Sequence, residues 1–423
     1  MLKKTSIETI KREKIAVAII VMLLLPPFIS LPFFIFTMLN KEKTTKTDYY
    51  TFFFCIAAYF AAINATKHVT GDQYQYYVAY MNVPHIGFWK SLIYIYGADL
   101  AREYQRTNIS GEFMNGVYNY IGYYLTFGYY PLFAFLLTFT DYMFIFLGLY
   151  KFSQTLEKPH IPIVCGALTL SFFYLFFNYT LQIQKQFLAQ SIMMYVLGSY
   201  AQTGKITKKT WIMITCAVFT HASTLLFIPF IVLKKLRSRL SKENIVFITL
   251  LFSLLIIAGP QLASGVVSSS KQSALTYGIS RLADSETNND TNFGLVWSQV
   301  LVIAIPMASI VLKKLWLERK TLNSTNAFIL NIVLLLLITI VAMYRQPLAQ
   351  YRYFMMLFAF MPFVYPFSFK AINQRDLFLK GLSYLMIAWF YFQFEKIVWH
   401  YADEWEIIVK PPVILIFGDY NII

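Results

Sequence analysis

Two of the candidate functional residues are ionisable side chains within or beside apolar runs, where charge is costly and is usually kept for function. Lys185, with Gln186 beside it, lies in the polar segment Gln182–Ala189 between two apolar runs. An ammonium group there suits a phosphate, which it binds as a point charge. His221 lies near the middle of the apolar run 211–233, and an imidazole can serve as a general base. The two positions predict an anion site and a proton acceptor.

A further group of candidates lies in the short stretch 344–353, which contains Arg345, Tyr351 and Arg352. This stretch joins two apolar runs on the side opposite the basic loops, where arginines run against the usual charge distribution of membrane proteins. Guanidinium groups bind phosphate through paired hydrogen bonds. We therefore expect these three residues to contact a phosphate-bearing substrate.

Asp72 follows an early apolar run and precedes a series of tyrosines. As a carboxylate outside a span, it suits recognition of a polar ligand or removal of a proton from an attacking hydroxyl group. Asp72 equally suits the N-cap of a helix beginning at Gln73. The sequence leaves both roles open.

Each of the other candidates also has a purely structural explanation. Lys185 could extend its ammonium group to the membrane surface, as lysines near span ends do. His221 could be a core residue with satisfied hydrogen bonds. The two arginines could pair with acids elsewhere in the chain or with lipid headgroups.

The rest of the chain predicts the elements that position these residues. Of the 423 residues, 58% are hydrophobic and 13% are charged, against about 25% charged in a soluble domain. The apolar runs predict an all-α polytopic transmembrane bundle of about ten to twelve helices, forming one integral membrane domain over residues 1–423. We expect the simpler spans at 49–66, 131–150, 160–178, 186–202, 243–259, 294–312, 325–343, 353–369 and 377–394.

Two apolar segments break the simple alternation, since each has basic residues on both sides. The segment 209–233 has about 25 residues, too few to cross a bilayer twice as helix. Two short helices meeting near residues 220–223 would explain it, as would one tilted span. The segment 15–39, which contains three prolines, is either one kinked span or a hairpin.

The net charge of +15 arises from lysines and arginines in short segments between apolar runs. This distribution places those segments in the cytoplasm and predicts a multi-pass protein of the bacterial inner membrane, with no nucleic-acid partner. The tyrosine-rich segment 67–130 and the polar loop 260–293 then lie in the periplasm. The N-terminal stretch predicts an uncleaved anchor.

Several reaction classes are disfavoured by missing motifs. Cys55, Cys165 and Cys216 lie apart in apolar runs, which argues against a disulfide framework or a zinc site. The sequence contains no P-loop, no dinucleotide-binding glycine pattern and no HExxH motif. We expect neither a metal nor a cofactor.

Four motifs, taken in order, give the chain a family resemblance. Asp72 followed by tyrosines comes first, then Lys185-Gln186-Phe187-Leu188-Ala189, then Phe219-Thr220-His221-Ala222-Ser223, and finally Arg352-Tyr353-Phe354. In this order the chain resembles the EpsG-like branch of the Wzy-type polysaccharide polymerases. The resemblance runs from about residue 50 to 370, with one departure: the family usually has arginine where this chain has Lys185, so paired binding of phosphate is lost there.

The resemblance implies a metal-independent glycosyltransferase of the GT-C-like membrane type. Such an enzyme joins oligosaccharide repeats carried on undecaprenyl diphosphate into O-antigen, capsule or exopolysaccharide, at the periplasmic face. Asp72 or His221 would be the base, while Lys185, Gln186, Arg345, Tyr351 and Arg352 would bind the substrate and its diphosphate. The implied partners are the lipid-linked oligosaccharide, the bilayer, a chain-length regulator and a flippase.

Other functions remain compatible with the sequence. One is a membrane acyltransferase with His221 as base, and another is a glucosyltransferase that uses a lipid monophosphate sugar. A flippase for lipid-linked oligosaccharide, or another secondary transporter, is a third, although such carriers usually show paired broken helices.

Overall fold

The computed structural model describes residues 15–100, 109–267, 294–343 and 347–423, and these residues form helices and loops without a β-strand. An apolar helix at Ile15–Leu24 precedes the labelled ones. The α-helices are α2 (Pro27–Leu39), α3 (Lys46–Ala65), α4 (Asp72–Met81), α5 (Val83–Ser91), α6 (Gly97–Leu100), α7 (Met114–Leu125), α8 (Tyr130–Ser153), α9 (His160–Ser171), α10 (Tyr174–Tyr179), α11 (Gln184–Thr203), α12 (Lys208–Thr220), α13 (Ile228–Val232), α14 (Lys242–Val267), α16 (Gly294–Leu312), α17 (Ser324–Ala342), α18 (Pro347–Ala359), α19 (Met361–Val364), α20 (Ile372–Phe394) and α21 (Pro412–Phe417).

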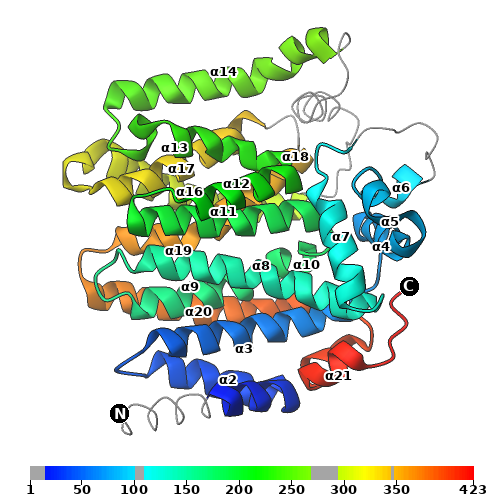
Figure 1. The fold of residues 1–423 in the computed structure, drawn as a ribbon. Coiled ribbons are helices and arrows are strands. Elements are labelled where there is room, and N and C mark those ends of the chain that lie inside the picture. Colours follow the sequence, from blue (N-terminus) through cyan, green and yellow to red (C-terminus); the bar gives the residue numbers. More distant parts are fainter. Residues whose placement is uncertain (1–14, 101–108, 268–293, 344–346) are drawn as a thin grey trace, which may run out of the picture.

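The long helices lie side by side, and the helices α4 to α7 gather at one end (Figure 1). Helix α8 packs between α3 and α11, α9 packs against α20, and α17 packs against α18 and α14. The short helices α4, α5, α6 and α7, which come from the tyrosine-rich segment, lie at the end of the bundle shown on the right. We call this the external end, and it is where the candidate site lies.

The observed helices confirm the all-α bundle and fall where the apolar runs predict spans. Within the described residues, α8, α17 and α20 are long and apolar enough to cross a bilayer. The total of ten to twelve spans stays a prediction. Three boundaries differ clearly from expectation. The run 160–178 is interrupted after α9, and α14 continues to Val267, so the polar loop starts later than residue 260. The run 353–369 is divided between α18, which already begins at Pro347, and the short α19. Residues 268–293 lie outside the described part.

The segment 209–233 forms a helical hairpin that enters and leaves at the same end of the bundle. Helix α12 ends at Thr220, His221 has extended backbone (φ −157°, ψ 129°), and a 3₁₀ turn leads into α13. The Arg237 guanidinium, just beyond the hairpin, donates to the Tyr200 hydroxyl in the last turn of α11, 3.0 Å away. Since α12 begins immediately after α11, both ends of the hairpin lie at the basic end. The two-helix interpretation is therefore the observed one.

The segment 15–39 also folds back on itself. The helix Ile15–Leu24 stops before Pro26, whose ψ of 135° ends the helical path, and α2 begins at Pro27. The Ser30 hydroxyl lies 3.6 Å from the Met22 sulfur, a contact that residues eight apart cannot make in one straight helix. The hairpin alternative holds for this segment.

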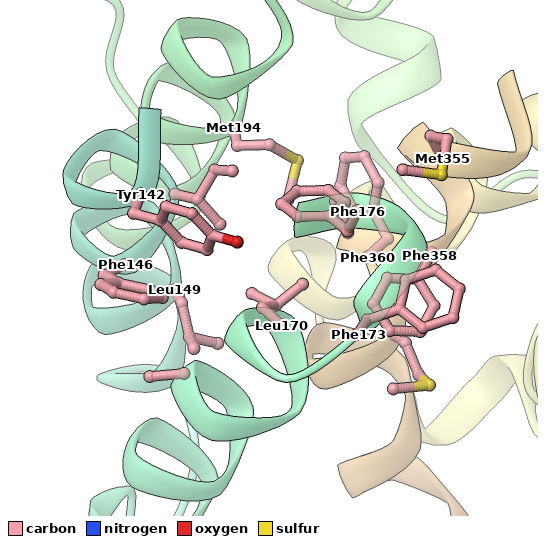
Figure 2. Close-up of a cluster of buried hydrophobic side chains, with 14 of the residues drawn as sticks. Tyr142, Phe146, Leu149, Leu170, Phe173, Phe176, Met194, Met355, Phe358 and Phe360 are labelled. Atoms are coloured by element: carbon pink, nitrogen blue, oxygen red, sulfur yellow. The ribbon is translucent and has the colours of Figure 1, made fainter. Parts of the chain in front are cut away.

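Aromatic and sulfur-containing side chains fill the centre of the bundle (Figure 2). Phe173 and Phe358 stack with ring centroids 3.7 Å apart, and Phe176 meets Phe187 edge-on at 4.3 Å. Lipid is as apolar as these side chains, so van der Waals packing rather than transfer from water holds the helices together. The broken helix α9–α10 is thereby fixed against α11 and α18.

Helices α8 and α11 cross closely at two glycines. A Cβ atom added at Gly198 would lie 2.2 Å from the Gly148 carbonyl oxygen, and one added at Gly148 would lie 2.6 Å from that of Met194. Because both obstacles are backbone, neither can move aside cheaply. Small residues at such crossings let helices approach in a membrane.

We expect Gly198→Ala to lower the free energy of unfolding by about 1–3 kcal/mol or more, because α8 and α11 must separate. The readout is the thermal unfolding midpoint of the detergent-purified protein. Gly381→Ala is the matched control, since a Cβ atom there meets nothing within 4 Å. Equal midpoints for the two variants would contradict the crossing.

Candidate active site

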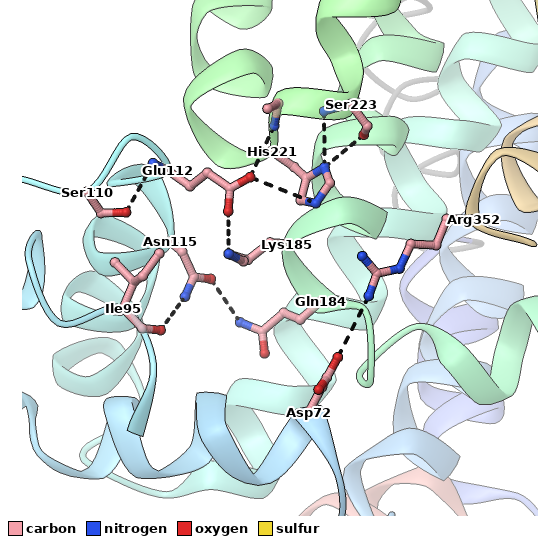
Figure 3. Close-up of polar contacts among 11 residues, drawn as sticks. Asp72, Ile95, Ser110, Glu112, Asn115, Gln184, Lys185, His221, Ser223 and Arg352 are labelled. Carbon is pink, nitrogen blue, oxygen red and sulfur yellow. Dashed lines mark hydrogen bonds and ion pairs between the residues drawn. The ribbon is translucent and has the colours of Figure 1, made fainter. Parts of the chain in front are cut away.

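Glu112 is the centre of a buried polar cluster near the external end of the bundle (Figure 3). It lies just before α7, and its side chain meets the first turn of α11 and the tip of the α12–α13 hairpin. Its Oε2 atom pairs with the Lys185 ammonium group, and its Oε1 atom accepts the backbone N–H of Ala222 at 3.2 Å. The Nε2 atom of His221 lies 3.8 Å from the same Oε1. We call Glu112, Lys185 and His221 the buried cluster.

Lys185 lies within protein and does not extend to the membrane surface. Its side chain is 2% exposed, and its ammonium group lies over the Tyr96 ring, 4.1 Å from the centroid. Beside it, Gln184 donates to the Asn115 side chain at 3.5 Å, and Asn115 donates to the Ile95 carbonyl. The snorkelling explanation is therefore wrong: the lysine is held by a counter-charge, an aromatic face and a surrounding amide network.

His221 occupies the turn between α12 and the 3₁₀ turn, and Ser223 fixes its ring. The backbone N–H of Ser223 donates to the Nδ1 atom at 3.2 Å, and the Ser223 hydroxyl lies 2.8 Å from the same atom. A neutral ring that accepts a backbone N–H at Nδ1 carries its proton on Nε2. That proton faces Glu112. The hairpin tip thus sets the orientation of the imidazole.

The charges of the buried cluster stabilise one another. Burial by itself raises the pKa of Glu112, but the adjacent Lys185 ammonium, His221 and the Ala222 N–H together hold that pKa below its usual value. Glu112 is therefore ionised at neutral pH and neutralises Lys185. A phosphate reaching Lys185 would have to compete with a carboxylate already in place.

A second pair of charges, Asp72 and Arg352, lies nearer to solvent (Figure 3). The Arg352 Nη2 atom is 4.0 Å from the Asp72 Oδ2, and the two side chains are 30% and 62% exposed. The Arg352 Nε atom is buried and has no hydrogen-bond partner among the described residues. The side chain as a whole is 30% exposed, so the exposed part of this guanidinium can meet a ligand. We call these residues the external pair.

Asp72 is not the N-cap of α4. The N-cap is Gly71, in the left-handed region with φ 55°, and Asp72 is the first helical residue, with no side-chain capping bond at this end. A carboxylate in the first turn is stabilised by the helix dipole while it stays accessible. The N-cap explanation for Asp72 is wrong.

The remaining expected site residues do not come together in one place. Gln186 donates to the backbone carbonyl of Arg352 at 3.5 Å, so it connects α11 to α18 beneath the external pair. Tyr351 is 4% exposed and packs edge-on against Tyr179, 5.3 Å between centroids. Arg345 lies outside the described residues. Direct substrate contacts by Gln186 and Tyr351 stay predictions, as does the role of Arg345.

Comparison with known proteins decides the family. The model of the EpsG family matches residues 50–402 of the 423-residue chain, which include the buried cluster and the external pair. The chain belongs to the EpsG family. No curated protein and no solved structure matches it. Membership in the EpsG family supports a multi-pass membrane protein and a polysaccharide polymerase.

Glu112 is the site residue of this EpsG-family protein that sequence reasoning missed. It lies in the polar segment 67–130, where a solvated carboxylate is ordinary, and no spacing connects it to Lys185 or His221. One signal in the sequence could have indicated it: a lysine buried inside protein requires a carboxylate nearby to balance its charge. Sequence reasoning also missed Asp141, because no motif surrounds it. Asp141 is buried in α8 and accepts a hydrogen bond from the Ser191 hydroxyl at 3.1 Å.

The described residues of the EpsG-family chain include no group of three or more His, Cys, Asp and Glu side chains placed to hold a metal ion. The buried cluster contributes one carboxylate and one imidazole. Its interactions are ionic and hydrogen-bonding, and they join α7, α11 and the hairpin tip.

Proposed function

We propose that this protein polymerises oligosaccharide repeats carried on undecaprenyl diphosphate at the periplasmic face of the bacterial inner membrane. The observation that carries the proposal is the external pair: a partly exposed guanidinium beside an exposed carboxylate, at the end of the bundle opposite the basic segments. A diphosphate and a nucleophilic hydroxyl need these two groups together. The product would be O-antigen, capsule or exopolysaccharide.

In the proposed reaction, a hydroxyl of the acceptor repeat attacks the anomeric carbon of the donor glycan. The new glycosidic bond forms as the bond from that carbon to the phosphate oxygen breaks, and undecaprenyl diphosphate leaves. Negative charge develops on the leaving oxygen, where fixed cations stabilise the transition state. Arg352 can meet a phosphate through the exposed part of its guanidinium, because the side chain is 30% exposed and lies 4.0 Å from Asp72.

The acceptor proton goes to Asp72 in this proposal. Its carboxylate is 62% exposed and can meet a sugar hydroxyl without displacing protein. His221 is less suited, because Nδ1 accepts from Ser223 and Nε2 faces Glu112. We assign His221, Glu112 and Lys185 to positioning: they tie the hairpin tip to α7 and α11, and hence fix the floor beneath the external pair.

Deletion of the gene in the native host, followed by electrophoresis of the surface glycan, tests the function. We expect the long ladder to disappear and the lipid-linked or core-linked single repeat to remain. Restoration by the plasmid-borne gene completes the experiment. An unchanged ladder in a host without a second polymerase would contradict the proposal and favour modification or transport of the glycan. Normal glycan synthesis in the deletion strain would also contradict the proposed partnership with a chain-length regulator and a flippase.

Asp72→Asn keeps the shape of the side chain and removes its basicity. We expect polymerisation to fall by about 10²–10⁴-fold, the usual contribution of a general base. The readout is ladder formation in the deletion strain, with the protein level in membranes measured alongside. Asp48→Asn is the control, since Asp48 caps α3 near Lys41, away from the site. A full ladder from Asp72→Asn would remove Asp72 as the base.

A further inference from the structure

A polar cavity lies between the loop after α3 and the C-terminal segment. Its volume is about 490 Å³, and its lining includes His68, Trp399, Asp419 and Tyr420. Pockets of this size are large enough for a small organic ligand. The charged residues already assigned to the reaction do not line it, so it is separate from the external pair.

Backbone hydrogen bonds build the cavity. His68 N–H donates to the His400 carbonyl and Val69 N–H donates to the Ile422 carbonyl, both at 2.7 Å. Ala402 N–H donates to the Thr66 carbonyl at 2.9 Å. The C-terminal segment is thus fastened to the loop that leads into α4, and the wall does not depend on side chains alone.

The chemistry of the lining fits a carbohydrate. Trp399 is 62% exposed, and because His400 stacks on one face of its indole with ring centroids 3.5 Å apart, the other face is the one open to a sugar. Tyr420 adds a phenol ring. Aromatic faces accept the apolar faces of sugar rings. Glu404, Asp419 and Asn421 line the same cavity and can accept the hydroxyl protons of a sugar. Such a mixed lining, aromatic and hydrogen-bonding, differs from the wholly apolar groove that a lipid chain requires.

The charge of the cavity lining indicates which sugars the cavity can bind. Of the three lining carboxylates, Asp403 is paired with Lys410, whereas Glu404 and Asp419 make no ion pair among the described residues. The surplus negative charge repels a diphosphate or a uronic acid and favours a neutral or amino sugar. The diphosphate is then directed to Arg352, the cation of the neighbouring site.

The cavity is also close enough to the external pair to hold one end of a glycan. His68, which lines it, precedes Asp72 by four residues. Four residues span at most about 14 Å even when fully extended. A short oligosaccharide can therefore occupy the cavity while one of its hydroxyl groups reaches Asp72.

We propose that this cavity is a glycan-binding subsite that holds neutral or amino sugars of the acceptor next to its reacting hydroxyl. The inference rests on the proposed polymerase function and adds a substrate class to it. The subsite holds each incoming acceptor repeat during its addition, so it acts on acceptor affinity more than on the chemical step.

The test measures binding of a defined probe to the full-length protein in lipid nanodiscs. The probe is the lipid-free oligosaccharide of one to three repeats, prepared by partial hydrolysis of the surface polysaccharide of the native host. Saturation-transfer NMR with titration gives the dissociation constant. We expect Trp399→Ala and Asp419→Asn each to raise it by about fivefold to tenfold. Trp89→Ala is the matched control, because Trp89 is 72% exposed in α5 and is not part of the cavity lining.

Equal dissociation constants for wild type, Trp399→Ala and Trp89→Ala would overturn the subsite, as would failure of wild type to bind at millimolar probe. The two proposals fail separately. Loss of the ladder on gene deletion with normal probe binding by Trp399→Ala removes the subsite and leaves the polymerase. An unchanged ladder on deletion removes the polymerase and with it the acceptor role. In an active preparation, Trp399→Ala should raise the KM for acceptor while kcat stays near that of wild type.

Discussion

Arg352→Ala is expected to abolish the long glycan ladder and to lower polymerisation by about 10²–10³-fold, the usual cost of removing one donor that stabilises a developing negative charge. The Arg352 side chain is 30% exposed, and its one ion pair among the described residues is the long contact of 4.0 Å to Asp72. Its removal therefore leaves the folded protein nearly intact and takes away the main cation facing the diphosphate. The measurement is ladder formation in the deletion strain, normalised to the protein level in membranes.

Two further variants sharpen this result. Arg352→Lys keeps the charge but loses the planar fork, so we expect an intermediate rate. Arg239→Ala is the control, since Arg239 is an exposed arginine that donates to the Lys320 carbonyl at the basic end. A normal ladder from Arg352→Ala, at the protein level of the control, would show that the diphosphate is bound elsewhere.

Glu112→Gln is expected to destabilise the protein by about 3–5 kcal/mol, because it leaves the Lys185 charge buried without its partner. Lys185 is 2% exposed and Glu112 is 7% exposed, so neither can turn to water. Lys185→Met should have a similar cost, because it leaves the carboxylate uncompensated. The measurement is the thermal unfolding midpoint in detergent, together with the amount of protein that reaches the membrane.

The double variant Glu112→Gln with Lys185→Met separates structure from catalysis. Removing both charges avoids the uncompensated ion, so we expect much of the lost stability to return. If the buried cluster only positions the site, polymerisation returns with it. A stable but inactive double variant would show that Lys185 or Glu112 acts on the substrate, which is the role that the motif resemblance implies for Lys185. Additive losses in the double variant would contradict the pairing itself.

The sequence predicted the elements well, because a membrane span is a local property. Twenty apolar residues need no partner to be recognised, and α3, α8, α11, α17 and α20 lie where such runs occur. The break near His221 was also predictable, since basic residues on both sides of a short run forbid a double crossing. Charge placement and length, both readable along the chain, carried these predictions.

The site was predicted in pieces. Asp72 and Arg352 were each singled out by charge and context, but only the fold shows that they pair. Glu112, Asp141 and the glycine crossing at Gly148 depend on contacts between helices distant in sequence, which leave no periodic signal. Lys185 was expected to offer its charge to a phosphate, and the fold instead gives that charge a carboxylate.

The hairpin of α12 and α13 has a consequence for biogenesis. Each of its arms is too short to enter the bilayer as an independent span, and its tip has non-helical backbone at His221. Such a segment is tolerated only where it packs against protein. Here the hairpin packs against α11, and Asn331 of α17 donates a hydrogen bond to the loop that follows α13. Since α17 lies about a hundred residues later in the chain, this contact cannot form until that helix has been synthesised and inserted. The hairpin is therefore anchored at its basic end only late in assembly.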